Sequence, residues 1–577
     1  MGKYNNSGRP SPRRYVAACV AVMAILFLGC SNRAAADTAA ARLPRCAELA
    51  GSLQEGAPLK AARSGVVRAN GQNVGHCRVD LRYGTSPEQN INIVILLPLS
   101  AADKGGGGVQ GAWNGRTQGQ GGGGCTGNIF QAPLQVAQAN EALRQGYVVS
   151  GNDLGHAGGD CEPGVNNDGT YNRGFIDDFI RTGIKQQVLW SKAVAKRYYG
   201  VAATYNYWNG CSTGGRQGYV LAQELGDELE GIMANAPAIY WTRFQTAQMW
   251  GQIAMRDLTG GAIAPDKLEQ TRVSAVAACD AADGVSDGII DDPRACTFSA
   301  KANICGAPGA PTRSCLTAAE AQAIDRIWDG PRNAQHDKIW FGLDRGSDFG
   351  ILDGIQPFPL GSMQFHWDEH ARTFDWKTVT LNDYARIAQD GSRNIAAVTD
   401  SDGPLDAFKA HGGKLLTFVG LNDQFIYPRG VIHYYRQMAS RYADGGKPDF
   451  ARLQGFYRLF AVPGVGHCGG GPGPVPVDSF GTLVKWVEHG VAPDSMLASG
   501  GTAAPPTGRT RPLCPYPQRA LYNGSGSTDD AKSFHCGGNV ESVPVVCADV
   551  LTGFKQEVSG GLDFSGMGVS RRECAAH

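Results

Sequence analysis

The sequence has no net charge and few charged residues. Its 53 Lys and Arg residues balance 53 Asp and Glu residues, and charged residues make up only 18% of the 577-residue chain. A nucleic-acid-binding protein needs a basic surface to neutralise phosphates, so nucleic-acid binding is excluded as the main activity. The hydrophobic share of 42% supports a sizeable core, which excludes a wholly disordered chain.

Long apolar runs are also scarce. The N-terminal run 15–28 is shorter than the roughly 20 residues that a membrane-spanning helix needs. Basic residues precede it and Gly29-Cys30-Ser31 follows it, a pattern typical of a secretory signal. Residues 27–30 also resemble a bacterial lipobox, which would make Cys30 a lipidated N-terminus, whereas Ala34-Ala35-Ala36 offers a rival cleavage site. We therefore expect residues 1–30 to be a signal peptide, the protein to be exported, and no later segment to span a membrane.

Glycine and cysteine, by contrast, are abundant. The 79 glycines are about twice the usual share, which predicts many tight loops and close backbone approaches. Sixteen cysteines indicate an oxidising compartment, in agreement with export. The length exceeds that of one ordinary domain, so we expect either two domains or one catalytic fold with a large insertion.

Strand-like and helix-like segments alternate in two parts of the chain. The pattern predicts strands at 92–97, 146–150, 205–208, 229–233, 414–419 and 457–462, with helices at 175–199 and 480–489. Such repetition predicts a parallel sheet covered on both faces. The stretch from about 240 to 400 lacks this rhythm. We predict one α/β domain, residues 31–240 and 400–577, interrupted by a lid-like insertion over 241–399.

The sharpest chemical motif is Gly210-Cys211-Ser212-Thr213-Gly214-Gly215. It fits the pattern G-x-S-x-G, and it lies between a predicted strand and a predicted helix at 217–224. In that setting the glycines allow a sharp turn that presents the serine hydroxyl at the edge of the sheet. The alternative is a glycine-rich turn whose serine only caps the following helix.

A serine nucleophile needs a base, and the base needs an orienting acid. In α/β enzymes with this motif the chain order is Ser, then Asp or Glu, then His. Asp423 follows the strand 414–419, and His467 follows the strand 457–462 between glycines and a cysteine. Asp402 and Asp406 are rival acids, although neither directly follows a strong strand. We predict a catalytic triad of Ser212, Asp423 and His467, against the alternative of a turn carboxylate and a surface histidine.

The neighbours of these residues extend the prediction. Cys211 precedes the serine and Cys468 follows the histidine, so a disulfide between them would join the two loops. An oxyanion hole needs backbone N–H donors, and one is expected from Thr213. The other is expected from the loop between Trp113 and Gly124, where glycine lets the backbone approach the substrate.

An acidic loop lies within the predicted insertion, between Cys279 and Cys296. Five carboxylates in thirteen residues would repel one another unless a hard cation lay among them, and calcium prefers such oxygen ligands. The spacing does not match an EF-hand, because no Glu closes a twelve-residue loop. The alternative is a solvated acidic loop.

Four motifs in order resemble the tannase and feruloyl esterase family, which includes the mono(2-hydroxyethyl) terephthalate hydrolase. They are the serine motif with Arg216, the loop Cys279–Ile289, the segment Pro463–Gly471 and the segment Arg511–Gln518. The resemblance runs from about Cys46 to Cys536. It implies a serine esterase with an α/β-hydrolase core, a large lid domain inserted between the nucleophile and acid strands, and a structural calcium ion in that lid.

The resemblance also implies roles for individual residues, namely those at the positions where this sequence matches the family's motifs. The resemblance implies the triad Ser212, Asp423 and His467, with oxyanion amides from Gly124 and Thr213. It implies calcium ligation by the side chains of Asp280, Asp283 and Asp287 and by the carbonyls of Val285 and Ile289. It further implies the disulfides Cys46–Cys77, Cys211–Cys468, Cys279–Cys296, Cys305–Cys315 and Cys514–Cys536. The remaining cysteines stay open, with Cys125–Cys161 and Cys547–Cys574 as the expected pairs.

The expected activity is hydrolysis of small aromatic esters, such as feruloyl or galloyl esters, through an acyl-enzyme. The alternatives are a hydrolase of mono(2-hydroxyethyl) terephthalate or related synthetic esters, and a secreted binding protein with a dead hydrolase core. Two departures from the family pattern bear on this. The tail from about 540 to 577 is additional, and segment 361–367 lacks an obvious arginine for a terephthalate carboxylate. Aromatic residues of the insertion would suit a phenolic acyl group or simply fill its core: Trp328, Trp340, Phe365 and Trp367.

Overall fold

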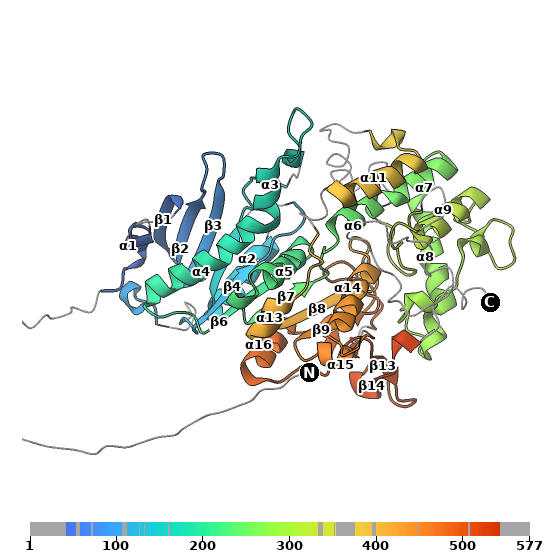
Figure 1. The fold of residues 1–577 in the computed structure, drawn as a ribbon. Helices are drawn as coiled ribbons and strands as arrows, with labels where there is room; N and C mark the ends of the chain where they lie inside the picture. The colour runs from blue at the N-terminus through green and yellow to red at the C-terminus, as the bar shows by residue number, and fades with distance from the viewer. Residues whose placement is uncertain are drawn as a thin grey trace, which may run out of the picture. The chain divides into compact units, whose positions relative to one another are not determined.

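A nine-stranded sheet organises the protein, with the strand order β1-β2-β3-β5-β4-β6-β7-β8-β9 (Figure 1). The computed structural model describes residues 42–542 except 54–57, 71–72, 107–111, 126, 128, 132, 160–161, 333–337, 351, 353–374, 395–399, 446 and 506–507. The strands are β1 (Leu59–Val67), β2 (His76–Tyr83), β3 (Ile91–Pro98), β4 (Arg116–Gln120), β5 (Val148–Asn152), β6 (Tyr205–Cys211), β7 (Gly231–Asn235), β8 (Lys414–Gly420) and β9 (Tyr457–Val462). This is a mixed α/β fold.

The sheet is parallel only in part. The strands from β5 through β4, β6, β7 and β8 to β9 run parallel, whereas β1, β2 and β3 pair antiparallel and β3 also meets β5 antiparallel. The expectation of a parallel sheet is therefore wrong for the predicted strand 92–97, which belongs to β3. The reason is the short loops 68–75 and 84–90, which join neighbouring strands antiparallel, because a parallel neighbour needs a long crossover.

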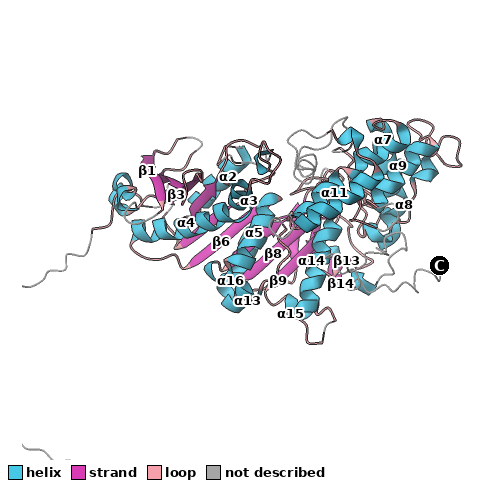
Figure 2. Ribbon diagram, turned by 45° about the horizontal axis from the view of Figure 1, so that its top comes forward, coloured by secondary structure: helices cyan, strands magenta, loops and turns pink. Residues whose placement is uncertain are grey.

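Helices cover both faces of the parallel part, as predicted (Figure 2). Successive residues of one strand point into separate apolar cores: Trp208 lies in one core and Tyr207 in the other, and Leu415 and Leu416 divide likewise. Such near-continuous burial is typical of central parallel strands. The covering helices are α2 (Pro133–Arg144), α4 (Gly183–Tyr199), α5 (Thr213–Glu224), α13 (Asp406–His411), α14 (Pro428–Arg441) and α16 (Ser479–His489).

The predicted helix 175–199 is not one regular helix. It consists of α3 (Arg173–Asp177), a π-helical turn at Asp178–Thr182, and α4. The irregular turn lies where the chain contacts the end of β5. A side-chain carbon on Gly183 would lie 2.8 Å from the side-chain oxygen of Asn152, so glycine allows this close approach.

A helical segment lies between β7 and β8 in the sequence. Its helices are α6 (Trp241–Gln248), α7 (Trp250–Thr259), α8 (Pro265–Cys279), α9 (Ala318–Asp329) and α11 (Leu381–Asn394). Trp328 and Trp340 are buried in its apolar core, at 0% and 1% exposure, so the structure gives them a packing role. Phe365, Trp367 and segment 361–367 lie outside the described residues.

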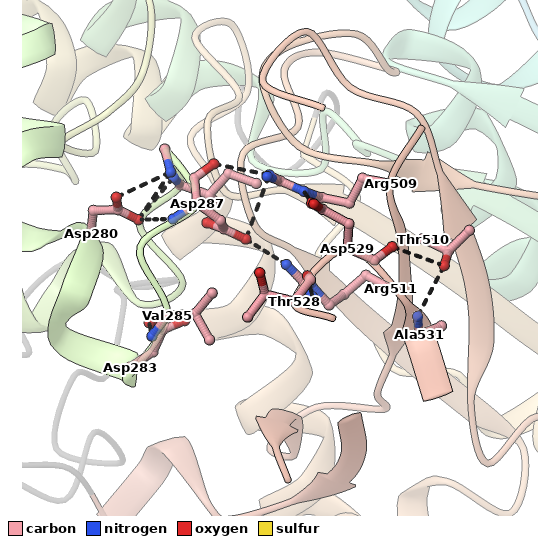
Figure 3. Close-up of polar contacts among 12 residues, drawn as sticks. Asp280, Asp283, Val285, Asp287, Arg509, Thr510, Arg511, Thr528, Asp529 and Ala531 are labelled. Atoms are coloured by element: carbon pink, nitrogen blue, oxygen red, sulfur yellow. Dashed lines mark hydrogen bonds and ion pairs between the residues drawn. The ribbon is translucent and has the colours of Figure 1, made fainter. Parts of the chain in front are cut away.

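Short antiparallel strands form the C-terminal part. β10 (Val475–Pro476), β11 (Met496–Ser499) and β12 (Thr510–Leu513) make one sheet, and β13 (Arg519–Tyr522) pairs with β14 (Phe534–Gly537). Arg509, which precedes β12, and Arg511, its second residue, reach the acidic loop of the helical segment (Figure 3). Arg511 forms an ion pair with Asp287, and Arg509 Nη1 donates to the Asp287 carbonyl at 2.9 Å.

We expect Arg511→Met to lower the free energy of unfolding by up to about 3 kcal/mol, because it leaves the buried Asp287 carboxylate with only Arg509 as an ion-pair partner, at 3.5 Å. Arg511 also donates to the Thr528 carbonyl at 2.6 Å and covers the Phe534 ring. Urea unfolding measures the loss. The matched control is Arg78→Met, whose pair with Asp80 is exposed and should contribute at most about 1 kcal/mol. An equal loss of unfolding free energy in the two variants would contradict a stabilising role for the buried Arg511–Asp287 pair.

A second prediction concerns Asp400, which accepts the backbone amide of Thr242 at 2.9 Å at the start of α6. Burial and the nearby Asp402 raise the pKa of Asp400 to about 7, above the usual 3.8. The unfolded chain therefore releases a proton that the folded chain retains, so this group costs stability as pH rises from about 4 to 7. Asp400→Asn removes that cost, at most about 4 kcal/mol.

The measurement for Asp400→Asn is the difference in Tm between variant and wild type at several pH values. We expect the difference to be small at pH 4 and to grow in favour of the variant up to pH 8. A difference that stays constant across this range would show that Asp400 does not titrate there.

Candidate active site

Ser212 lies at the turn between β6 and α5 in an unusual backbone conformation, with φ 64° and ψ −126°. Positive φ is rare for a residue with a side chain and costs about 1–3 kcal/mol, so the surroundings must enforce it. Two glycines make this possible. A side-chain carbon on Gly210 would lie 2.4 Å from the Gly214 carbonyl oxygen, so strand and helix can meet only without one. The serine stays partly exposed at the sheet edge, as the motif predicts.

The loop after β4 contacts this turn. A side-chain carbon on Gly121 would lie 2.5 Å from the Cα atom of Gly214, and the Gly122 amide donates to Gln217 of α5 at 3.2 Å. Gly124, the predicted oxyanion donor, is in the same loop and has φ 57°. Thr213 is the first residue of α5, where a backbone N–H has no acceptor within the helix. The predicted donor Thr213 thus directly follows Ser212, and the predicted donor Gly124 belongs to a loop that contacts α5 through Gly121 and Gly122.

Asp423 and His467 are paired. Each follows one of two adjacent parallel strands, β8 and β9, and His467 Nδ1 lies 2.9 Å from Asp423 Oδ2. Asp423 is fully buried, and its Oδ1 accepts the amides of Phe425 at 2.9 Å and Ile426 at 2.8 Å. The histidine remains partly exposed, with 17% of its side chain accessible. The carboxylate is therefore fixed by the backbone and fixes the imidazole in turn.

The rival acids take other partners. Asp406 pairs with Arg441 and accepts a hydrogen bond from Tyr442 at 2.8 Å. Asp402 lies near the buried Asp400, and its negative charge helps to raise the pKa of Asp400. Neither carboxylate is bonded to His467 in the described part of the chain.

A disulfide joins the serine turn to the histidine loop. Cys211 and Cys468 are bonded, with 5.9 Å between their Cα atoms, so the adjacent Ser212 and His467 lie on two linked loops. Within the described residues, no hydrogen bond joins Ser212 Oγ to His467. Catalytic hydrogen bonds are often long in the absence of substrate. A triad of Ser212, Asp423 and His467 is therefore compatible with this geometry.

The other expected disulfides are present as well: Cys46–Cys77, Cys279–Cys296, Cys305–Cys315 and Cys514–Cys536. Cys125 is disulfide-bonded, and its expected partner Cys161 lies outside the described residues. The predicted signal peptide 1–30, with Cys30, and the tail from 543, with Cys547 and Cys574, also lie outside them. Among the described residues, no helix is both long and apolar enough to cross a membrane.

Three neighbours of the site carry no sequence signal that would have identified them. The Phe425 ring lies 5.1 Å from the His467 ring, and Gln424 Oε1 accepts the His467 amide at 3.3 Å. From α6, Gln248 donates to the Phe425 carbonyl at 2.8 Å. Gln248 is 177 residues from Phe425, and no local pattern predicts such a contact.

The acidic loop has ligand types that suit calcium, although its carboxylates already have partners (Figure 3). Asp280 Oδ1 accepts the amides of Asp287 at 3.0 Å and Ile289 at 3.3 Å, and Asp283 accepts that of Val285 at 2.9 Å. Desolvation and the neighbouring Asp283 raise the pKa of Asp291, which shows that acidic groups crowd there. Over the described ranges, no three His, Cys, Asp or Glu side chains converge as metal ligands would.

Comparisons with known proteins agree with this geometry. The family model of tannase and feruloyl esterase matches residues 109–356 and 352–537. A probable feruloyl esterase of Arthroderma benhamiae is 34% identical over 474 residues, covering 78% of this chain and 83% of that protein. A mono(2-hydroxyethyl) terephthalate hydrolase of Piscinibacter sakaiensis is 28% identical over 497 residues, covering 74% and 79%.

Solved structures give the same result. The crystal structure of an esterase from Aspergillus oryzae superposes with a TM-score of 0.72 at 25% identity, covering 85% of this chain and 99% of that one. Tannin acyl hydrolase from Aspergillus niger, at 22% identity and a TM-score of 0.72, shares the fold. The serine turn, the paired Asp and His and these matches lead to one conclusion: the chain belongs to the tannase and feruloyl esterase family of carboxylic ester hydrolases.

Proposed function

We propose that the protein hydrolyses esters of phenolic acids, such as feruloyl or galloyl esters, with Ser212 as nucleophile. The Asp423–His467 pair carries this proposal, because its loop is linked by Cys211–Cys468 to the serine turn. Feruloyl esterases are among the relatives, which favours a phenolic acyl group. The acyl chemistry also follows from the site, since it needs only a serine, a base and amide donors.

The proposed reaction has two steps. Since Nδ1 of His467 binds Asp423, Nε2 is the nitrogen that takes the proton of Ser212 as Oγ attacks the ester carbonyl. Asp423 stabilises the imidazolium, and the amides of Gly124 and Thr213 bind the oxyanion. The C–O bond to the alcohol breaks and His467 protonates the leaving alkoxide. Water, deprotonated by His467, then attacks the acyl-enzyme, and the acid leaves with Ser212 reprotonated.

We assign the sheet to the α/β-hydrolase type, with residues 31–240 and 400–577 as catalytic domain. The helical segment 241–399 is proposed as its lid, since it enters after β7 and thus between the serine strand β6 and the acid strand β8. Gln248 of this segment bonds to the loop beside His467, which supports a role next to the substrate.

A second candidate substrate is mono(2-hydroxyethyl) terephthalate or a related synthetic aromatic ester. The specific observation in its favour is the relative of that name at 28% identity. We rank it second, because the relative with 34% identity is a probable feruloyl esterase.

Export and a structural calcium ion complete the proposal. The disulfides suit an oxidising compartment, which agrees with a signal peptide at 1–30 and leaves lipidation at Cys30 as a further proposal. Calcium would be held by carboxylates and carbonyls of the acidic loop and would neutralise their charge: Asp280, Asp283, Val285, Asp287 and Ile289.

Ser212→Ala should lower kcat for methyl ferulate by at least about 10⁴-fold, because the covalent route is lost. Release of free acid from methyl ferulate, methyl gallate and mono(2-hydroxyethyl) terephthalate measures activity and ranks the two candidate substrates. The control is Ser191→Ala, a buried serine of α4 that should leave kcat unchanged. Activity that survives in Ser212→Ala would overturn the triad, and a wild type inactive on every ester would favour a binding protein.

Calcium should raise the Tm of the wild-type protein, and a chelator should reverse the rise. At a calcium concentration of 100 Kd the gain is about 2.7 kcal/mol. Asp283→Asn should abolish the shift, whereas Asp227→Asn, an exposed aspartate outside the loop, should retain it. A Tm that ignores both calcium and chelator would contradict a structural calcium ion.

A further inference from the structure

Phe425 is an aromatic residue whose side chain lies beside His467 of the catalytic pair. Its ring centroid lies 5.1 Å from that of His467, with 41° between the ring planes. Both residues are partly exposed, in contrast to the fully buried Asp423. A large apolar side chain that remains partly accessible next to the general base is positioned to contact whatever the base acts on.

The backbone of Phe425 is held from two sides. Its amide donates to Asp423 Oδ1 at 2.9 Å, and its carbonyl accepts from Gln248 Nε2 at 2.8 Å. One bond ties the residue to the acid loop, and the other ties it to α6 of the helical segment. The backbone of Phe425 is therefore tied to the same carboxylate that binds the imidazole.

We propose that Phe425 is the platform for the aromatic ring of the acyl group and determines the preference for aromatic over aliphatic acyl chains. This inference rests on the proposed function, because it takes His467 as the base at Ser212. The ester carbonyl must lie at Ser212 Oγ within reach of His467, so the acyl substituent extends past the neighbours of the imidazole. Offset aromatic pairs are favoured beyond the area that they bury, and an aliphatic ring of equal size lacks this gain.

The test compares two substrates that differ only in the aromaticity of the ring, methyl cinnamate and methyl 3-cyclohexylacrylate. The readout is the ratio of their kcat/KM values. Phe425→Leu should lower the ratio by about 3- to 10-fold, mainly through the aromatic ester. Phe425→Tyr keeps the ring and should keep the ratio.

The matched control is Phe480→Leu, a partly buried phenylalanine of α16 packed against Tyr147 and Tyr207, which should leave the ratio unchanged. A ratio in Phe425→Leu within about 2-fold of wild type, with both esters slowed alike and the acid limb of the pH profile shifted, would overturn the proposal. Phe425 would then only position His467. A wild type inactive on both esters would instead reject the proposed function itself.

Discussion

The site depends on how closely three backbone segments approach one another around Ser212. Gly210 lies near the end of β6, Gly214 lies in the first turn of α5 and Gly121 lies in the loop after β4. A side-chain carbon at either Gly210 or Gly121 would lie within 2.5 Å of Gly214 backbone atoms. The same close packing surrounds Ser212, which has positive φ and directly precedes the first residue of α5. The proposed oxyanion donor Thr213 therefore lies at the N-terminus of α5, where the first backbone amides have no acceptor within the helix.

The remaining machinery is attached to this turn by a few long-range links. Asp423 and His467 come from adjacent strands, and the disulfide Cys211–Cys468 couples their loop to the serine. Gln248 connects the helical segment to the acid loop, and Arg511 connects the C-terminal strands to the acidic loop of that segment. The loops all follow strands that end at the same edge of the sheet, and these contacts connect the loops to one another.

Sequence patterns predicted the parts of this site that depend on local structure. Ser212, Asp423 and His467 each follow a short apolar run, and a parallel sheet brings such strand ends to one edge. The antiparallel pairing of β1 to β3 was missed, because apolar runs alone do not reveal strand direction. The π-helical turn at 178–182 was also missed, because the spacing of apolar residues does not distinguish one π-helical turn from a continuous α-helix.

Contacts between segments far apart in the chain could not be predicted from the sequence. Nothing near Gln248 in the sequence points to Phe425, and nothing in Arg511 points to Asp287, which is 224 residues away. Four of the five disulfide pairs that join two described cysteines were predicted only from the resemblance to a family. The roles assigned to the triad, oxyanion and calcium residues remain predictions, which rest on the motifs and on that resemblance.

The most direct test of the central claim is to trap the acyl-enzyme. Methyl ferulate would be mixed with the protein, the reaction quenched in acid within the first turnovers, and the digested protein examined by mass spectrometry. A feruloyl group on the peptide that contains Ser212, absent when His467 is replaced by Ala, is the result that the account predicts. Steady release of ferulate with the acyl group on another residue, or with His467→Ala fully active, would contradict it.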